Sequence, residues 1–405
     1  MAPGALGYDD AMRWALAFLL LVGCLPDTSG YGEGDLDGGA VDGGAVDGGG
    51  ASDGGVADGA SSGADGGGTV DGGTGRDAAR PVDLGEGTLG PAQCVAVELP
   101  CLDASRPDVV EVPTEATAAA LASASPGTIV QVRGATLTGL HRVAPLVTVR
   151  GCEGATLAEA GTLWPSQGSG ATIEGFRIAG DVFLNQTGYY VVRNNVFVGR
   201  TGSEPSIDAN SRDALVSADV EVLVEANHFE GVPAGIVLST RYDTMTHAVT
   251  ADVRNNLFTG VAAPITVSEA GLVGEIQATL QHNTFHAFDV AIDFFGIDNR
   301  PRVDGNLFVT GETGVRTDGI YDGAGNMASG VTQPAAVPPV GGSIPTIDPP
   351  FVDEGGGDFR LAPGSLAIDA VAGGSVDQDL GGCPRPVAFG PGAARADVGA
   401  YEARR

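Results

Sequence analysis

The chain has 405 residues, of which 43% are apolar, enough for a sizeable core in one large domain or two ordinary ones. Its formal net charge is −30, and all 21 basic residues are arginine. No basic face exists to release phosphate counterions, so the composition argues against nucleic-acid binding. The absence of lysine excludes a lysine base and Schiff-base chemistry.

The N-terminus is typical of an export signal. Arg13 precedes the apolar run Trp14–Val22, which is too short to span a bilayer as a stable helix. The next residues, Leu21-Val22-Gly23-Cys24, resemble the lipobox of bacterial lipoproteins, whose cysteine is diacylated and becomes the mature N-terminus. The resemblance implies that residues 1–23 are a signal peptide and that Cys24 is lipidated. The protein would then lie in the cell envelope, at the outer membrane or cell surface, with the lipid as its only membrane contact. The alternative is an ordinary secretory signal with an incidental cysteine.

Residues 24–90 are predicted to be a disordered linker. Between Gly32 and Gly75 the chain is almost entirely Gly, Asp, Ala and Ser, which cannot form a core. Mutually repelling aspartates extend such a chain, so it would act as a spacer off the membrane. Calcium binding by the repeated Asp-Gly is the alternative, but the nonapeptide period of calcium-loaded β-rolls is missing.

Four cysteines remain once Cys24 is assigned to lipid, two of them in a lead-in segment at residues 91–114. They are Cys94, Cys101, Cys152 and Cys383. In an exported chain they indicate two disulfides, with three possible connectivities. Closeness in sequence favours Cys94 with Cys101, which leaves Cys152 with Cys383. No Cys-x-x-Cys pair is present and the histidines are scattered, so no metal site is expected.

Residues 115–330 contain an internal repeat, Asn-x-Phe inside a short β-branched run. Its asparagines are Asn195, Asn227, Asn256, Asn283 and Asn306. A degenerate earlier copy ends at Phe176. Successive phenylalanines from Phe176 to Phe308 are 21, 32, 29, 27 and 23 residues apart, about one three-strand coil with loops of varying size. The repeat therefore predicts a solenoid with variable loops.

One such unit cannot bury its Val, Ile and Phe side chains alone, but stacked coils can. An Asn at the same bend in each coil can adopt the αL conformation and bond to its neighbours, which predicts a structural asparagine ladder beside an interior phenylalanine column. A short helix from Thr114 to Ala124 would cover the open end. We expect an all-β fold, a right-handed single-stranded parallel β-helix of roughly eight coils with an N-terminal capping helix.

These features resemble the right-handed parallel β-helix repeat proteins, the pectate-lyase-like group that also includes many bacterial surface proteins. Pro126–Val132, followed by Gly134, is similar to the usual opening of such domains. In the C-terminal cap region, residues 331–405, the segments Leu361–Ala370, Asp377–Arg385 and Asp397–Glu402 resemble the end of surface-anchored proteins with choice-of-anchor domains. Four charged residues are expected there to form an ordered cap with buried ion pairs: Asp369, Asp379, Arg385 and Asp397.

Three functions are compatible with this fold, and fold alone does not choose among them. The first is a monomeric surface adhesion or carbohydrate-binding protein, whose stacked coils would face a polysaccharide. The second is a polysaccharide lyase acting on uronate-containing polymers. The third is a passive envelope protein without a ligand.

A lyase would need a base near the uronate α-proton and acids or calcium to neutralise the substrate carboxylate. The densest charged stretch suggests Arg300 or Arg302 as the base, with Asp293 and Asp298 on calcium; the alternative is surface charge pairing. No other cofactor is expected. The motifs of polygalacturonase-like hydrolases are missing, including an Arg-x-Lys that a lysine-free chain cannot supply. The three histidines in or beside the repeats are expected at outward strand positions: His228, His282 and His286.

Overall fold

The structure is a computed structural model. It describes residues 99–113, 116–166, 170–210, 219–240, 247–269, 274–296, 300–372, 377–382, 385 and 395–403. The expected signal peptide, the lipidation site Cys24 and the linker lie outside the described residues, as do Cys94, Cys383 and Asp298. Within the described ranges, no helix has the length and apolar character needed to cross a membrane.

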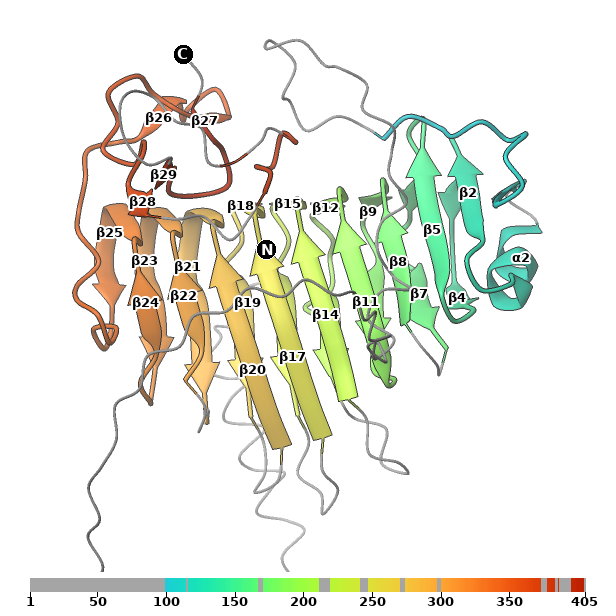
Figure 1. Cartoon of the computed structure of the whole chain (residues 1–405), viewed down its shortest axis with the longest axis horizontal. Coiled ribbons are helices and arrows are strands. Elements are labelled where there is room, and N and C mark those ends of the chain that lie inside the picture. Colours follow the sequence, from blue (N-terminus) through green and yellow to red (C-terminus); the bar gives the residue numbers. More distant parts are fainter. Residues whose placement is uncertain are drawn as a thin grey trace, which may run out of the picture. The chain divides into compact units, whose positions relative to one another are not determined.

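The described chain is almost entirely β-structure, arranged as stacked coils (Figure 1). Ten parallel strands form sheet A, in the order β1 (Val109–Glu111), β2 (Ile129–Arg133), β5 (Val147–Cys152), β8 (Gly170–Glu174), β11 (Gly188–Arg193), β14 (Asp219–Glu225), β17 (His247–Arg254), β20 (Gly274–Gln281), β22 (Arg302–Asp304) and β24 (Asp322–Ala324).

The second parallel sheet supplies the other two faces of the coil. Face B1 holds the short strands β3 (Thr136–Leu137), β6 (Thr156–Leu157), β9 (Arg177–Ile178), β12 (Val196–Val198), β15 (His228–Glu230) and β18 (Leu257–Thr259). Face B2 holds β4 (Leu140–Val143), β7 (Thr162–Pro165), β10 (Asp181–Leu184), β13 (Pro205–Asn210), β16 (Ala234–Ser239) and β19 (Ala263–Ser268). Three long strands run through both faces and join them: β21 (Thr284–Phe295), β23 (Leu307–Thr317) and β25 (Met327–Ala335).

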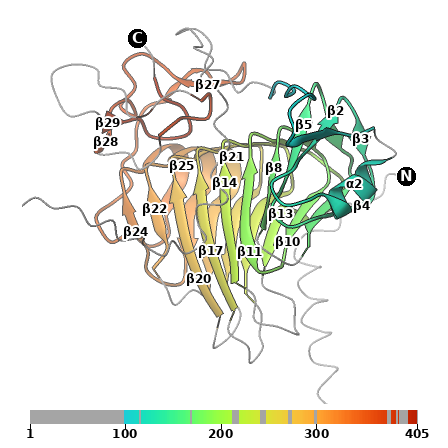
Figure 2. The same ribbon diagram turned by 45° about the vertical axis from the view of Figure 1, so that its right-hand side comes forward.

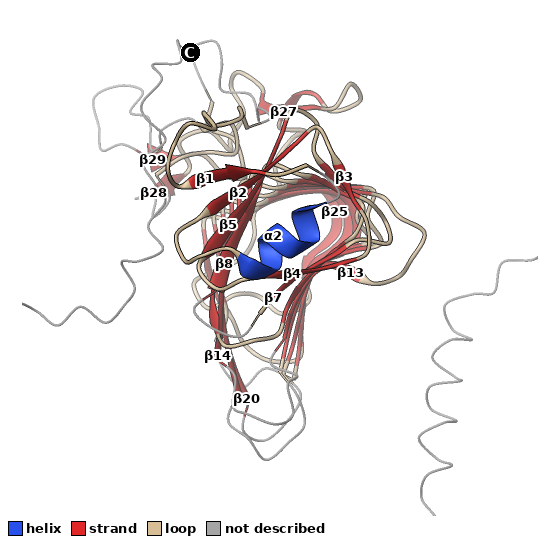
Figure 3. Cartoon of the chain, turned by 90° about the vertical axis from the view of Figure 1, so that its right-hand side faces the viewer, coloured by secondary structure: helices blue, strands red, loops and turns tan. Residues whose placement is uncertain are grey.

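Each coil passes from sheet A to face B1 and then to face B2. In Figure 3 the N-terminal end of the solenoid faces the viewer, with β2 on the left, β3 at the upper right and β4 below. The chain therefore turns clockwise as it recedes from the viewer. This is a right-handed parallel β-helix, as the sequence predicted. Of the ten strands of sheet A, β1 precedes the first complete coil, so nine coils follow, compared with the roughly eight expected.

The phenylalanines of the repeat form a continuous interior stack. Phe197, Phe229, Phe258, Phe285 and Phe308 are fully buried, and neighbouring rings are nearly parallel with centroids 4.5–5.2 Å apart. The expected column is present, but Phe176 does not begin it. Ile178 pairs with Phe197, which places Phe176 two residue positions earlier, at the level of Asn195.

The asparagine ladder runs beside this stack. The side-chain Oδ1 of Asn283, for example, accepts hydrogen bonds from the backbone N–H and from the Nδ2 of Asn256, both at 3.0 Å. The expected αL geometry belongs to the preceding residue instead, as Asn255 and His282 show with φ of 54° and 51°. The ladder also extends to Asn326, whose Oδ1 accepts from the Asn306 N–H at 2.9 Å. The sequence repeat did not reveal Asn326 because Met327-Ala328 follows it where Phe stands in the other copies.

The N-terminal end of the solenoid is covered by helix α2 (Thr117–Ser123) (Figures 2 and 3). Leu121 is fully buried against the first coils, which confirms the capping helix. The helix is shorter than predicted, and its N-cap residue is Ala116, with no side-chain cap. Thr117 instead donates its hydroxyl to the carbonyl of Pro113 at 3.1 Å.

A strap formed by residues 99–108 leads into β1 and crosses the outer surface of the first coils. Its Cys101 forms a disulfide with Cys152 at the end of β5, so the favoured pairing of Cys101 with Cys94 is wrong. The Leu102 N–H also donates to Gln131 Oε1 at 2.7 Å. The strap must approach β2 in parallel to add β1 as an outer strand, and this path brings Cys101 beside the next coil.

The C-terminal region folds back against face B1. It contains two antiparallel pairs, β26 (Phe351–Asp353) with β27 (Asp358–Leu361) and β28 (Val371–Ala372) with β29 (Arg395–Ala396). Its apolar side chains pack on Leu307 and Val309, which point outward from the solenoid. The region therefore covers the side of the last coils.

Replacing Phe258 by Ala is expected to lower the free energy of unfolding by about 3–5 kcal/mol, because it leaves a cavity in the stacked column. Chemical denaturation measures the change. Phe295→Ala is the matched control, since that ring is 62% exposed and its loss should change stability little. Equal effects of the two variants would contradict an interior column.

The double variant Cys101→Ser/Cys152→Ser tests the strap. The disulfide closes a sequence separation of 51 residues, so its loss should cost about 2–4 kcal/mol of stability. Urea unfolding of the variant and the parent checks this. An unchanged unfolding midpoint would show that the strap's hydrogen bonds hold it without the disulfide.

Candidate functional site

The charged residues favoured from the sequence do not form one site. Asp293 lies on β21 and pairs with Arg316, whose Nε is 2.8 Å from Asp293 Oδ1. Arg302 lies on sheet A and pairs with Asp304, while Arg300 Nη1 is 3.8 Å from Asp322 Oδ1. The proposed set is wrong for its described members, because the chain changes face between β21 and β22 and separates residues that are close in sequence. These are exposed ion pairs, the alternative weighed from the sequence.

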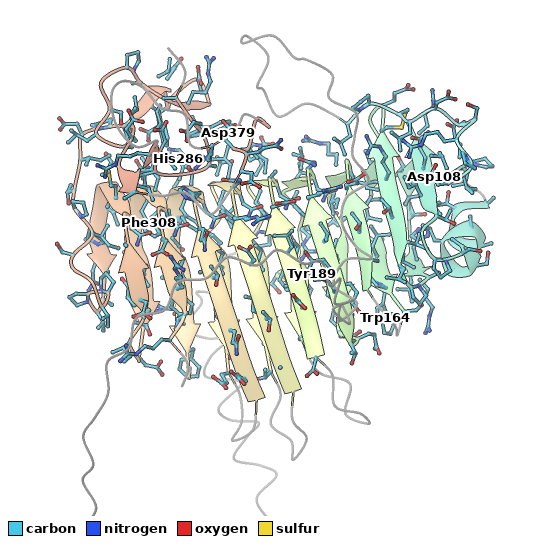
Figure 4. The ribbon with its side chains drawn as sticks, in the orientation of Figure 1. Asp108, Trp164, Tyr189, His286, Phe308 and Asp379 are labelled. Carbon is cyan, nitrogen blue, oxygen red and sulfur yellow. A yellow bond between two sulfur atoms is a disulfide. The ribbon has the colours of Figure 1, made fainter. Side chains whose placement is uncertain are left out.

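The described surface is hollowed instead on the outer face of sheet A. Two adjoining hollows of about 280 Å³ and 430 Å³ share Tyr189, Glu221 and Thr250 in their linings, and we call them together the sheet A groove. Figure 4 labels Tyr189 on this sheet. The larger hollow adds Asp219, and the smaller adds Asp252, Arg254 and Thr279.

The groove follows from strand length and register. Strands β14, β17 and β20 have seven, eight and eight residues, whereas β8 has five and β22 has three. Parallel pairing aligns Tyr189 with Glu221 and Glu221 with Thr250 in one outward row. Three steps between four strands, at about 4.8 Å each, give the groove a length of roughly 14 Å along the solenoid axis.

A row of alternating charge borders the groove. Pairing aligns Arg150, Glu174, Arg193, Glu225 and Arg254 on successive strands. Glu174 accepts from Arg150 at 2.7 Å and from Arg193 at 2.9 Å, and this part of the row is buried next to the strap. At the groove, Arg254 Nη2 is 2.9 Å from Glu225 Oε2 and Nη1 is 3.2 Å from Asp252 Oδ2. Both cationic ends of Arg254 are therefore already engaged.

Burial and neighbouring charges raise the pKa of two groove residues. Burial raises the pKa of Asp252, an effect that Arg254 opposes and Glu225 reinforces. Its Oδ1 is shielded from solvent and has no hydrogen-bond partner among the described residues. Burial, followed by the charges of Glu225 and Glu221, raises the pKa of Tyr189. Tyr189 thus presents a neutral hydroxyl that can both donate and accept a hydrogen bond.

Sequence reasoning missed this site, although a signal was present. In 219–225, 248–254 and 275–281, apolar and polar residues alternate over a longer stretch than in the other repeats. Such alternation gives each strand extra outward positions. Tyr189 is the aromatic residue at the end of the outward row.

The histidines take different positions. His228 points outward as expected, with Nε2 3.0 Å from Thr259 Oγ1. His286 also points outward but lies under the C-terminal region, 2.8 Å from Glu354 Oε1 and against Phe359. The expectation is wrong for His282, which occupies the αL bend and is buried.

The C-terminal region is an ordered cap with a buried ion pair, as expected. Arg385 and Glu402 have fully buried side chains, with Nε 3.5 Å from Oε2. The Asp397 carboxylate accepts from the Asp369 N–H at 2.7 Å, and Asp379 accepts from the Glu402 N–H at 3.0 Å. These charges hold the cap together and do not line the groove.

Arg385 also affects the protonation of the His282 imidazole. Its Nη1 lies 2.8 Å from His282 Nδ1, and the carbonyl oxygen of Asp397 lies 3.1 Å from the same nitrogen. In the neutral ring, Nδ1 can accept from Arg385 or donate to Asp397, but it cannot do both. Burial, and then the charge of Arg385, lowers the pKa of His282 to about 3. His282 is therefore neutral in the folded protein near pH 7.

Acid should destabilise the parent protein more than His282→Gln. The folded pKa of about 3 lies below the ordinary 6.5, so the unfolded chain takes up the proton first as pH falls. Stability from this group is complete above pH 6.5 and is lost toward pH 3, with a slope of at most on the order of 1 kcal/mol per pH unit. Denaturation across this range compares the two proteins, and identical slopes would contradict the prediction.

The groove combines an aromatic hydroxyl with carboxylate, guanidinium and threonine groups, which can hydrogen-bond a hydroxyl-rich ligand. Among the described residues, no group of three or more His, Cys, Asp and Glu side chains is placed to hold a metal ion.

Comparison of the chain with protein-family models, curated proteins and solved structures yields no match.

Proposed function

We propose that this protein is a cell-envelope lipoprotein, akin to pectate-lyase-like surface proteins, that binds a carbohydrate polymer in the sheet A groove. The groove itself is the observation that carries the proposal. It crosses four in-register strands, so side chains recur along it at the roughly 4.8 Å spacing of neighbouring strands. A repeating polymer laid along the solenoid axis can meet such a surface with several similar contacts.

The composition of the groove supports a carbohydrate ligand. Tyr189 offers an apolar ring face and a polar tip, a combination that suits the mixed surface of a sugar ring. Around it stand Glu221, Thr250, Asp252 and Thr279, which can accept or donate hydrogen bonds at fixed positions. They project from strands, which hold them more rigidly than loops would.

A lyase is the weaker alternative because its chemistry needs an available base beside neutralising cations. Arg254 is the guanidinium in the groove lining, and Glu225 and Asp252 both engage it. Glu221 and Asp219 would repel a uronate carboxylate. The geometry therefore favours binding over uronate cleavage.

Affinity electrophoresis through gels containing neutral, acidic or amino polysaccharides tests the proposal. We expect retardation by at least one polymer, weakened about tenfold in Kd by Tyr189→Ala, which corresponds to about 1.4 kcal/mol. Phe295→Ala removes an exposed aromatic ring from face B2 and should bind as the parent does.

Product analysis separates the competing functions. New reducing ends or unsaturated sugars that depend on the groove would identify an enzyme. Retardation without products identifies a binding protein. If no polymer retards the protein, a structural role in the envelope replaces the proposed function.

A further inference from the structure

We infer that the sheet A groove selects a glycan bearing positive charge, an amino sugar polymer, over a uronate polymer. This inference rests on the proposed function and specifies its ligand. It follows from the excess of carboxylates over guanidiniums at the groove, and from the pairing of those guanidiniums with carboxylates of the protein itself.

Carboxylates outnumber guanidiniums on the outer face of β11 to β20. The described outward side chains there include five acids and two arginines: Asp219, Glu221, Glu225, Asp252, Glu275, Arg193 and Arg254. Arg193 contacts Glu174 and Glu225, and Arg254 contacts Glu225 and Asp252. On the next strand, Arg302 is paired with Asp304. The cations at this face are thus already matched, and negative charge is left over.

The excess lies where a ligand would sit. Asp219 and Glu221 project from β14 into the two hollows, Asp252 projects from β17, and Glu275 follows on β20 beside Ala248. A ligand along the solenoid axis would therefore pass carboxylates on three consecutive strands. Protonated amines on successive sugars could pair with them.

Asp252 is a groove carboxylate that is only partly compensated within the protein. Arg254 contacts its Oδ2, while Oδ1 is shielded from solvent without a donor among the described residues. The Asp252 side chain is 38% exposed as a whole, but shielding one acceptor oxygen from water without a donor is still costly. A cationic group bound at the hollow beside Asp252 would lower that cost, whereas a bound carboxylate would raise it.

Charge at longer range acts in the same direction. The chain carries a formal charge of −30, so an approaching polyanion is repelled before it reaches the groove. This general field also attracts any polycation, so a test must separate attraction by the whole protein from recognition by the groove.

The experiment compares two oligomers with the same sugar backbone, chitosan oligomers, which carry protonated amines, and the same oligomers after full N-acetylation, which are neutral, with oligogalacturonate as the anionic reference. Isothermal titration of the purified full chain measures each Kd. We expect chitosan to bind at least tenfold more tightly than its acetylated form, with a preference that falls as salt is added, and oligogalacturonate to bind least.

Two variants assign the preference to the groove. Glu221→Gln and Asp252→Asn should each weaken binding of chitosan several-fold more than binding of the acetylated oligomer, and so reduce the preference for chitosan. Glu153→Gln is the matched control, because it removes the same charge from a side chain that is 58% exposed and outside the groove.

The outcomes distinguish the inference from the proposed function. Equal binding of both chitosan forms, or preference for oligogalacturonate, overturns the charge inference while the carbohydrate-binding function stands. A preference that Glu153→Gln weakens as much as Glu221→Gln does overturns the role of the groove. If the parent binds no oligomer, the proposed function fails and the inference fails with it.

Discussion

The hydrogen bonds of the asparagine ladder set the register on which the rest of the structure depends. From Asn227 onward, each ladder Oδ1 accepts hydrogen bonds from two N–H groups of the coil before it, for instance the backbone and side-chain N–H of Asn227 at Asn256. A slip of one residue would break these bonds at buried positions, where an unsatisfied polar group costs about 1–3 kcal/mol. The same register stacks Phe229 on Phe258. The hydrogen bonds of the asparagine ladder and the stacked phenylalanine rings at this bend therefore favour the same register.

Exact stacking also determines where a binding surface can form. When coils are in register, a strand that lengthens by two residues adds one more outward side chain directly beside those of its neighbours. This happens in β14, β17 and β20, and the result is a groove whose side chains recur at the strand spacing. The ladder supplies order without itself contacting the groove, since its asparagines are buried.

Buried ion pairs at the N-terminal strap and in the C-terminal cap have a structural role. Arg150 and Glu174 lie next to the strap, and Arg385 and Glu402 lie inside the cap, each charge paired within the protein. Removing one partner of such a pair is costly because it leaves an uncompensated buried charge. These pairs therefore specify how the N-terminal strap and the C-terminal cap attach. At the groove, by contrast, carboxylates exceed their partners, and this difference separates structural from ligand-facing charge.

The sequence alone determined the right-handed β-helix, the ladder from Asn195 to Asn306 and the Phe column, because each depends on a local pattern repeated at the length of one coil. The charged cap followed instead from a resemblance carried by C-terminal segments. Nearness in sequence failed as a guide to neighbours across coils. It paired Cys101 with Cys94, and it grouped Asp293 with Arg302 although they lie on different faces. The groove could not be predicted because its residues meet only when separate coils stack. Only the tertiary structure decided which outward rows were long enough to form it, since strand length and register are properties of pairs of coils.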